Sequence, residues 1–427
     1  MFGGQGASNL YSPRALCKVR ESTRTCKTAL SLLSRCHAAF IDELQSMDQR
    51  TKDRLAIDPD RFCSPQDLLS LDASLQSHSL IQMIVIVLAQ LLHYAAEIES
   101  HPGSFDTYLE QVLEVDGFCS GLLTAAVVAS SSDEAMFSFF GVQAFRLAFW
   151  LGCRSFLQSQ SIEPVRSDGS TWSLVVIGLG AETVLEELRQ YKSIHNGCRI
   201  CVSAISSETV VSLTGPTQEL VELKRNLTAP MTKFANVQSW YHGGENLTGI
   251  FDEILKDQQR RNITFPNLKD LIVPLRSSRN GLLIEEDSSN TSSLSEVIIQ
   301  NILLHPIDWV STATKIVNSI NSCQGGVETW RGEIISFGPS SESLFAELRT
   351  RATGKNISFM DLSPFKTGDE IEVGRNDIAI IGMGVHFPKG NGQERLWETL
   401  SMGLNAVSKV RQYVDAISNI AQKVVLY

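Results

Sequence analysis

The chain has 427 residues, of which 43% are hydrophobic and 20% are charged, a globular composition that excludes collagen-like, low-complexity and wholly disordered chains. At roughly 150 residues per domain, this length predicts two to three domains. The 37 Lys and Arg against 47 Asp and Glu give a formal charge of −10 without a basic block, so we expect neither nucleic acid nor a membrane as the main partner.

Helical patterns dominate the first part of the chain. The pattern over residues 38–99 is mostly helical, and its most apolar stretch, 80–96, is short for a membrane span and predicts a buried core helix. A short strand over 111–121 enters a glycine-bounded turn, after which apolar helices are expected over 122–130 and 137–157.

The pattern changes after residue 172. Strands and helices then alternate in the order βαββαβ, with strands at 173–177, 199–205, 209–214 and 233–237 and helices at 182–191 and 217–227. This order is typical of a ferredoxin-like subdomain, which we place at 172–239 as an insert in a larger α/β fold.

The last part of the chain begins with a polar segment. Residues 277–295 predict a surface loop, helices are expected over 294–302 and 309–320, and a strand over 332–337. Residues 363–376 predict a linker before a new strand-and-turn unit.

The most specific local motif is Gly117-Phe118-Cys119-Ser120-Gly121. It has the spacing of a strand-to-helix nucleophile elbow, with cysteine at the nucleophile position. The elbow would put the Cys119 sulfur at a helix N-terminus, where we expect the backbone N–H groups and the helix dipole to favour a thiolate. The alternative is a buried structural cysteine between two chance glycines.

A nucleophilic cysteine needs a base. Among eight histidines, His242 is the best candidate because it directly follows the last strand of the insert, where the chain must re-enter the main domain. His305, before a proline between two helices, is expected to be structural.

Several segments together resemble one known family. They are Phe2-Gly3-Gly4-Gln5-Gly6, the cysteine elbow, the strand pair from Cys201 to Pro216, the segment from Leu304 to Trp309, and Phe337-Gly338-Pro339. In this order they resemble the malonyl-transacylase-like acyltransferase fold and, within it, the starter-unit acyl-carrier-protein transacylase domain of fungal non-reducing polyketide synthases. The resemblance covers about residues 1–362.

The resemblance implies roles for particular residues. Cys119 would take the acyl group as a thioester, and His242 would deprotonate the cysteine and the incoming thiol in turn. The Ser120 backbone N–H and the backbone N–H near Gln5 would form the oxyanion hole.

The resemblance also bears on the substrate. Malonyl-specific relatives carry an arginine where this chain has Leu151, so a pocket lined by Phe149, Trp150 and Leu151 is expected to prefer an uncharged acyl chain. The substrate would be acyl-CoA or an acyl group on phosphopantetheine, with no tightly bound cofactor. An acyl carrier protein would be the acceptor, and a fatty acid synthase or a reducing polyketide synthase a candidate donor.

The tail resembles a second family. Residues 377–384, Phe387-Pro388 and Leu396-Trp397 are similar to the start of a β-ketoacyl synthase domain, and the similarity ends near Val410. We therefore expect 377–427 to be a truncated N-terminal fragment without condensing activity.

Two motifs and the cysteine usage exclude other classes. Gly178-Leu179-Gly180 lacks the third glycine of a dinucleotide fingerprint, and the spacing of His195, Cys198 and Cys201 lacks a fourth ligand, so no metal is expected. Nine scattered cysteines predict a reducing, cytoplasmic location. The residues leave open a thioester hydrolase with the same Cys/His pair, or a non-catalytic docking or scaffold fragment.

Overall fold

A computed structural model describes residues 1–4, 13–100, 105–163, 171–287, 293–322, 332–339, 341–353, 356–362, 386–387 and 390–391. The chain forms two units, Met1–Thr367 and Gly368–Tyr427. In the second unit the described part is an antiparallel pair of short strands, β10 (His386–Phe387) and β11 (Gly390–Asn391).

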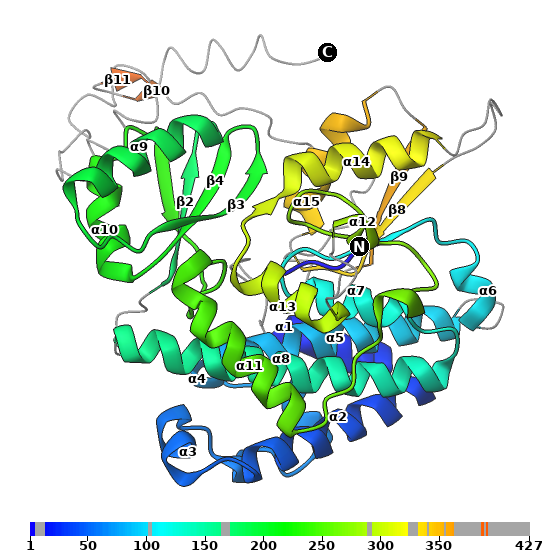
Figure 1. The fold of residues 1–427 in the computed structure, drawn as a ribbon. Helices are drawn as coiled ribbons and strands as arrows, with labels where there is room; N and C mark the ends of the chain where they lie inside the picture. The colour runs from blue at the N-terminus through cyan, green and yellow to red at the C-terminus, as the bar shows by residue number, and fades with distance from the viewer. Residues whose placement is uncertain are drawn as a thin grey trace, which may run out of the picture. The chain divides into compact units, whose positions relative to one another are not determined.

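Long helices form the base of the first unit (Figure 1). Helices α2 (Lys27–Gln45), α5 (Ser79–Ser100) and α8 (Glu134–Ile162) pack against one another. Helices α5 and α8 are long and apolar enough to cross a membrane, yet most of each is buried in the fold. A helix that is apolar on nearly all sides is the expected centre of a large core, so the predicted core helix at 80–96 is confirmed.

The helical pattern predicted over 38–99 is interrupted in the structure. After α2 the chain forms short turns before α5 begins at Ser79, namely α3 (Gln49–Leu55), η1 (Pro59–Arg61), η2 (Pro65–Leu69) and α4 (Ala73–Gln76). Asp48, Asp58 and Asp72 each accept a backbone N–H at the start of one of these turns. These capping residues, together with Pro59 and Pro65, interrupt the helix, although the spacing of the apolar residues by itself predicts that it continues.

The elbow strand is shorter than predicted. Strand β1 (Val115–Asp116) has two residues and pairs in parallel with β6 (Leu275–Arg276), while Phe2 forms a parallel bridge with Gly117. Helix α7 (Gly121–Ala129) follows directly and is fully buried.

The βαββαβ insert is present as predicted. Its strands are β2 (Ser173–Ile177), β3 (Cys201–Ser207), β4 (Val210–Thr214) and β5 (Met231–Phe234), and its helices are α9 (Ala181–Ile194) and α10 (Thr217–Asn226). The sheet order is β5-β2-β4-β3, the ferredoxin-like order of fourth, first, third and second strand. Strand β7 (Ile307–Asp308) joins the sheet in parallel with β3, which ties the insert to the main body.

The first unit contains further helices and strands. They are α1 (Pro13–Thr23), α6 (Phe105–Leu109), η3 (Gly244–Leu247), α11 (Thr248–Arg260), η4 (Leu268–Asp270), α12 (Ile284–Asp287), α13 (Leu294–Leu303), α14 (Trp309–Ser322), β8 (Gly332–Ser336), α15 (Ser341–Arg351) and β9 (Ile357–Asp361). Strands β8 and β9 pair in parallel. Cys119 packs in one apolar cluster with residues of α14, α15 and the insert edge.

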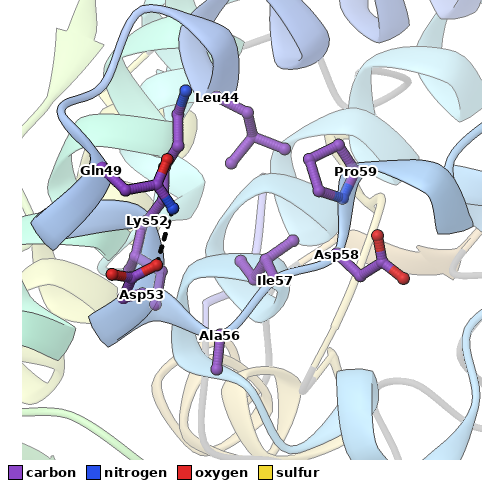
Figure 2. Close-up of a pocket in the computed structure, with 9 residues that line it drawn as sticks. Leu44, Gln49, Lys52, Asp53, Ala56, Ile57, Asp58 and Pro59 are labelled. Atoms are coloured by element: carbon purple, nitrogen blue, oxygen red, sulfur yellow. Dashed lines mark hydrogen bonds between the residues drawn. The ribbon is translucent and has the colours of Figure 1, made fainter.

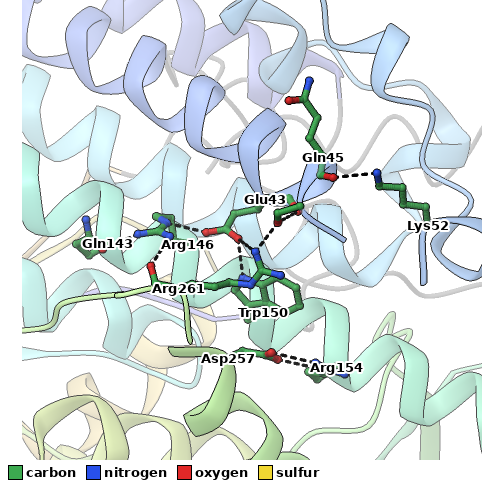
Figure 3. A network of polar contacts seen from close by, with 10 residues as sticks. Glu43, Gln45, Lys52, Gln143, Arg146, Trp150, Arg154, Asp257 and Arg261 are labelled. Carbon is green, nitrogen blue, oxygen red and sulfur yellow. Dashed lines mark hydrogen bonds and ion pairs between the residues drawn. The ribbon is translucent and has the colours of Figure 1, made fainter. Parts of the chain in front are cut away.

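A buried carboxylate joins α2 to α8 (Figure 3). Glu43, 3% exposed, accepts hydrogen bonds from Arg146 Nε at 2.7 Å, Trp150 Nε1 at 3.0 Å and Arg261 Nη1 at 2.9 Å. The Arg261 guanidinium also lies 4.0 Å from the centre of the Trp150 ring. The cluster therefore ties the end of α11 to the helical base.

Replacing Glu43 with glutamine is expected to lower the free energy of unfolding by about 2–4 kcal/mol, because it leaves two guanidinium groups beside a neutral amide. The cost is reduced because both arginine side chains are about a fifth exposed. Urea unfolding measures the change. Glu186→Gln, which breaks an exposed pair with Arg189, is the control and should leave the midpoint unchanged. Equal midpoints for both variants would refute the prediction.

Candidate active site

Cys119 lies in the tight turn between β1 and α7. Its φ of +54° is in the left-handed region, which is strained for a residue with a side chain. A Cβ on Gly121 would lie 2.2 Å from the Phe2 carbonyl oxygen, so this glycine is needed for the close approach of the N-terminal segment. The elbow thus presents Cys119 at the N-terminus of α7, as the motif predicts.

His242 lies in the loop that follows the insert, and its side chain contacts Cys119. The backbone N–H of His242 donates to Ile302 O at 3.1 Å, and the backbone N–H of Gly243 donates to Leu303 O at 2.8 Å. These two hydrogen bonds hold the loop at the end of α13. His242 also has a left-handed backbone, with φ of +53°. Its Nε2 lies 3.2 Å from Cys119 Sγ.

The second ring nitrogen assigns the tautomer. His242 Nδ1 lies 2.7 Å from the backbone carbonyl of His305, and a carbonyl can only accept a hydrogen bond. Nδ1 therefore carries the proton, and Nε2 is the lone-pair nitrogen that faces the thiol. The three groups form a hydrogen-bonded chain in space: a thiol, a base and a carbonyl acceptor that orients the base.

Burial decides the charge of the pair. It raises the pKa of the Cys119 thiol to about 12, and the hydrogen bond from the Ser120 backbone lowers it by less. It also lowers the pKa of His242 to about 4, against the hydrogen bond to His305. Burial therefore favours the neutral form of both groups, so desolvation opposes the thiolate that the helix N-terminus is expected to favour.

Of the two predicted oxyanion residues, the structure describes Ser120, which follows the cysteine in sequence. Ser120 is fully buried at the start of α7. Gln5 lies outside the described residues, but the segment that leads to it, Phe2–Gly4, contacts the elbow: a Cβ on Gly4 would be 2.8 Å from Cys119 Cβ. The oxyanion roles of Ser120 and Gln5 remain predictions.

The three predicted pocket residues are buried in α8. The ring of Phe149 contacts those of Phe40 and Trp150. Trp150 belongs to the Glu43 cluster, and Leu151 is fully buried. None of these described contacts involves Cys119 or His242, and the pocket role remains a prediction.

Sequence reasoning missed one component of the site. His305, expected to be structural, supplies the backbone carbonyl that orients His242. The side-chain sequence carries no signal for such a role, because every residue has a carbonyl.

A separate cavity lies near α3 (Figure 2). Its volume is about 460 Å³, and its lining includes Leu44, Lys52, Asp53 and Ile57. No predicted site residue lines it, and it is distinct from the Cys119–His242 pair.

Comparisons with known proteins show the family and the fold of the chain. Residues 1–242 match the family model described as "Starter unit:ACP transacylase in aflatoxin biosynthesis", and residues 375–425 match "Beta-ketoacyl synthase, N-terminal domain". Among curated relatives, orsellinic acid synthase ArmB of Armillaria ostoyae is 28% identical over 98% of this chain, and the non-reducing polyketide synthase dbaI of Emericella nidulans is 25% identical over 73%. The chain spans 19% and 11% of these two proteins.

Solved structures identify the fold. The chain is similar to MCAT from Mycobacterium tuberculosis, with a TM-score of 0.57 and 16% identity over 85% of this chain and 95% of that one. It is also similar to the malonyl-transacylase in the PlMCAT:AntF complex, with a TM-score of 0.55 and 16% identity over 84% and 94%. The predicted acyltransferase fold with a ferredoxin-like insert is therefore confirmed.

Proposed function

Since the chain belongs to the starter unit:ACP transacylase family, we propose that it moves a starter acyl group through an acyl-Cys119 thioester to the phosphopantetheine thiol of an acyl carrier protein. The observation that carries the proposal is the 3.2 Å approach of His242 Nε2 to Cys119 Sγ, with Nδ1 held by a carbonyl. The acyl donor is acyl-CoA or a carrier-bound acyl group from a fatty acid synthase or a reducing polyketide synthase.

In the first half-reaction the neutral pair acts in concert. Cys119 Sγ attacks the thioester carbonyl carbon while His242 Nε2 takes the thiol proton, and the carbonyl oxygen becomes an oxyanion near the Ser120 N–H. The intermediate collapses, the carbon–sulfur bond to the donor breaks, and His242 returns the proton to the leaving thiolate. Acyl-Cys119 and the free donor thiol are the products.

The second half-reaction reverses these roles. The phosphopantetheine thiol of the carrier gives its proton to His242 and attacks the acyl-Cys119 carbonyl. The Cys119 sulfur leaves and takes the proton back. Each step exchanges one thioester for another, so the site must position two thiols in turn and exclude water.

The proposed substrate is an uncharged acyl chain. Leu151 stands where malonyl-specific relatives carry an arginine, and a malonyl carboxylate buried without a cation would be costly. We further propose that residues 1–362 form the acyltransferase domain, with the insert at 172–239. Residues 363–376 would be a linker, and 377–427 the beginning of a β-ketoacyl synthase domain. The eight cysteines of the described residues are free, which supports a reducing, cytoplasmic setting.

The experiment incubates the purified chain with acyl-CoA thioesters of increasing length and with malonyl-CoA, followed by a phosphopantetheinylated carrier protein. Intact mass should show an acyl adduct that the carrier removes, with uncharged chains loaded at least about tenfold faster than malonyl. Release of free acid without carrier loading would favour a hydrolase. No adduct from any donor would favour a docking or scaffold fragment.

A further inference from the structure

We infer that Gln90 is a positioning residue for the reaction at Cys119, an inference that rests on the proposed function. Gln90 lies in the middle of α5 and is fully buried. Its side chain joins the N-terminal segment, the turn at Gly338 and helix α7, three parts of the chain that meet around the elbow.

The Gln90 amide makes three hydrogen bonds to these partners, which use both of its donor hydrogens and one acceptor position of Oε1. Nε2 donates to Gly3 O at 2.7 Å and to Gly338 O, and Oε1 accepts from Thr124 Oγ1 at 3.0 Å. The orientation is determined, because the two carbonyls only accept and the Thr124 hydroxyl can donate. Thr124 lies on α7, five residues after Cys119, and is also fully buried.

The segment that Gln90 holds contacts the nucleophile. Phe2 N donates to Asp116 O at 2.9 Å and Phe118 N donates to Phe2 O at 2.8 Å, while Gly3 N donates to Gly338 O at 2.9 Å. These bonds place Gly4 so close to the elbow that a Cβ there would be 2.5 Å from Phe118 O.

Gly3 has even less space. A Cβ on it would lie 1.6 Å from Pro339 O, so its backbone is enclosed between the turn and Gln90. The Gly3 carbonyl belongs to the same rigid peptide unit as the Gly4 nitrogen, and fixing one therefore fixes the other.

The consequence is kinetic. Through the Gly3 carbonyl, Gln90 holds the Phe2–Gly4 segment in contact with the elbow that carries Cys119. A carbonyl that reacts with Sγ must fit beside this segment, and a displacement of about 1 Å near reacting atoms can cost roughly 10²-fold in rate. Loss of Gln90 should therefore slow acyl transfer much more than it weakens substrate binding.

The test compares Gln90→Met with Gln82→Met in the full chain. Gln82 is a buried glutamine of the same helix, 1% exposed, whose amide donates to Gln76 O at 2.9 Å. Single-turnover loading from acyl-CoA gives the maximal rate and the half-saturating concentration. Alkylation of Cys119 by iodoacetamide, which forms no oxyanion, reports whether the thiol remains accessible and reactive.

Gln90→Met is expected to lower the maximal acylation rate about 10²-fold, with the half-saturating concentration and the alkylation rate within about threefold of the parent. Gln82→Met should acylate at the parental rate. Thr124→Val, which removes the hydroxyl that orients the amide, should lower acylation by about three- to tenfold, and it serves as the test if Gln90→Met does not fold.

Two results overturn the inference. One is parental acylation by Gln90→Met, or by Thr124→Val where that variant serves as the test. The other is an equal fall in acylation and alkylation, which would indicate a general structural role. An unaltered chain that forms no acyl adduct would contradict the proposed function and this inference together.

Discussion

Replacing Cys119 with alanine is expected to abolish the acyl adduct and to lower carrier loading by at least about 10³-fold. Cys119 Sγ is the sulfur that the geometry places 3.2 Å from an imidazole lone pair, and no acyl thioester can form on an alanine. Intact mass after incubation with acyl-CoA measures the adduct, and loading of the carrier measures transfer.

Cys153→Ala is the matched control for this change. Cys153 is fully buried in α8, and burial raises the pKa of its thiol to about 12, as for Cys119. If burial and chemical type were enough to make a cysteine the acyl acceptor, Cys153 would also be acylated and Cys119→Ala would keep an adduct. We expect the Cys153→Ala protein to keep it. Full transfer by Cys119→Ala would refute the acyl-Cys119 route.

Replacing His242 with alanine is expected to slow acylation of Cys119 by about 10²–10⁴-fold at pH 7. The reason is electrostatic: burial raises the pKa of the Cys119 thiol to about 12, so very little thiolate exists at pH 7 without a base that takes the proton during attack. Single-turnover acylation between pH 4 and 9 measures the effect.

The pH profile distinguishes a base from a structural histidine. In the parent, the neutral imidazole is the active form, and its lowered pKa of about 4 predicts a rate that is level near neutrality and falls as pH drops through about 4. In His242→Ala the rate should instead rise about tenfold per pH unit, because it follows ionisation of the thiol.

His78→Ala is the control. His78 has a pKa that burial also lowers to about 4, and its Nε2 lies 3.0 Å from Leu55 O. It should keep the parental pH profile, whatever stability it loses. A parental rate in His242→Ala would contradict the role of His242 as base.

The parts of the fold that the sequence predicts well are those with a local signal. The cysteine elbow follows from five consecutive residues, and the insert follows from strands and helices whose hydrophobic periods differ. The pattern at 38–99 was predicted to be mostly helical without its interruptions, although Asp48, Pro59 and Pro65 are capping and breaking residues that could have marked them. The strand at 111–121 was too long, because pairing partners decide how far a strand extends.

The site could be predicted only as separate candidates. Cys119 and His242 are 123 residues apart, and their contact depends on how the insert returns the chain to the end of α13. The backbone carbonyl of His305 has no side-chain signature. Gln90 is a polar residue in an apolar helix, and the sequence does not indicate what it contacts. Its three hydrogen-bond partners are in residues far away in the chain, Gly3, Thr124 and Gly338.

The amino-acid sequence by itself predicted a ferredoxin-like insert, a cysteine at the nucleophile position and a histidine after the insert, and its resemblance to a known family implied an α/β acyltransferase. Such features can be predicted from short motifs and from hydrophobic periodicity, because both depend only on residues that are close in the sequence. Only the tertiary structure decided that burial shifts the pKa of the cysteine up and that of the histidine down, which favours the neutral form of both. The pKa of each group depends on how much water the whole fold removes from it, and no local motif specifies that burial.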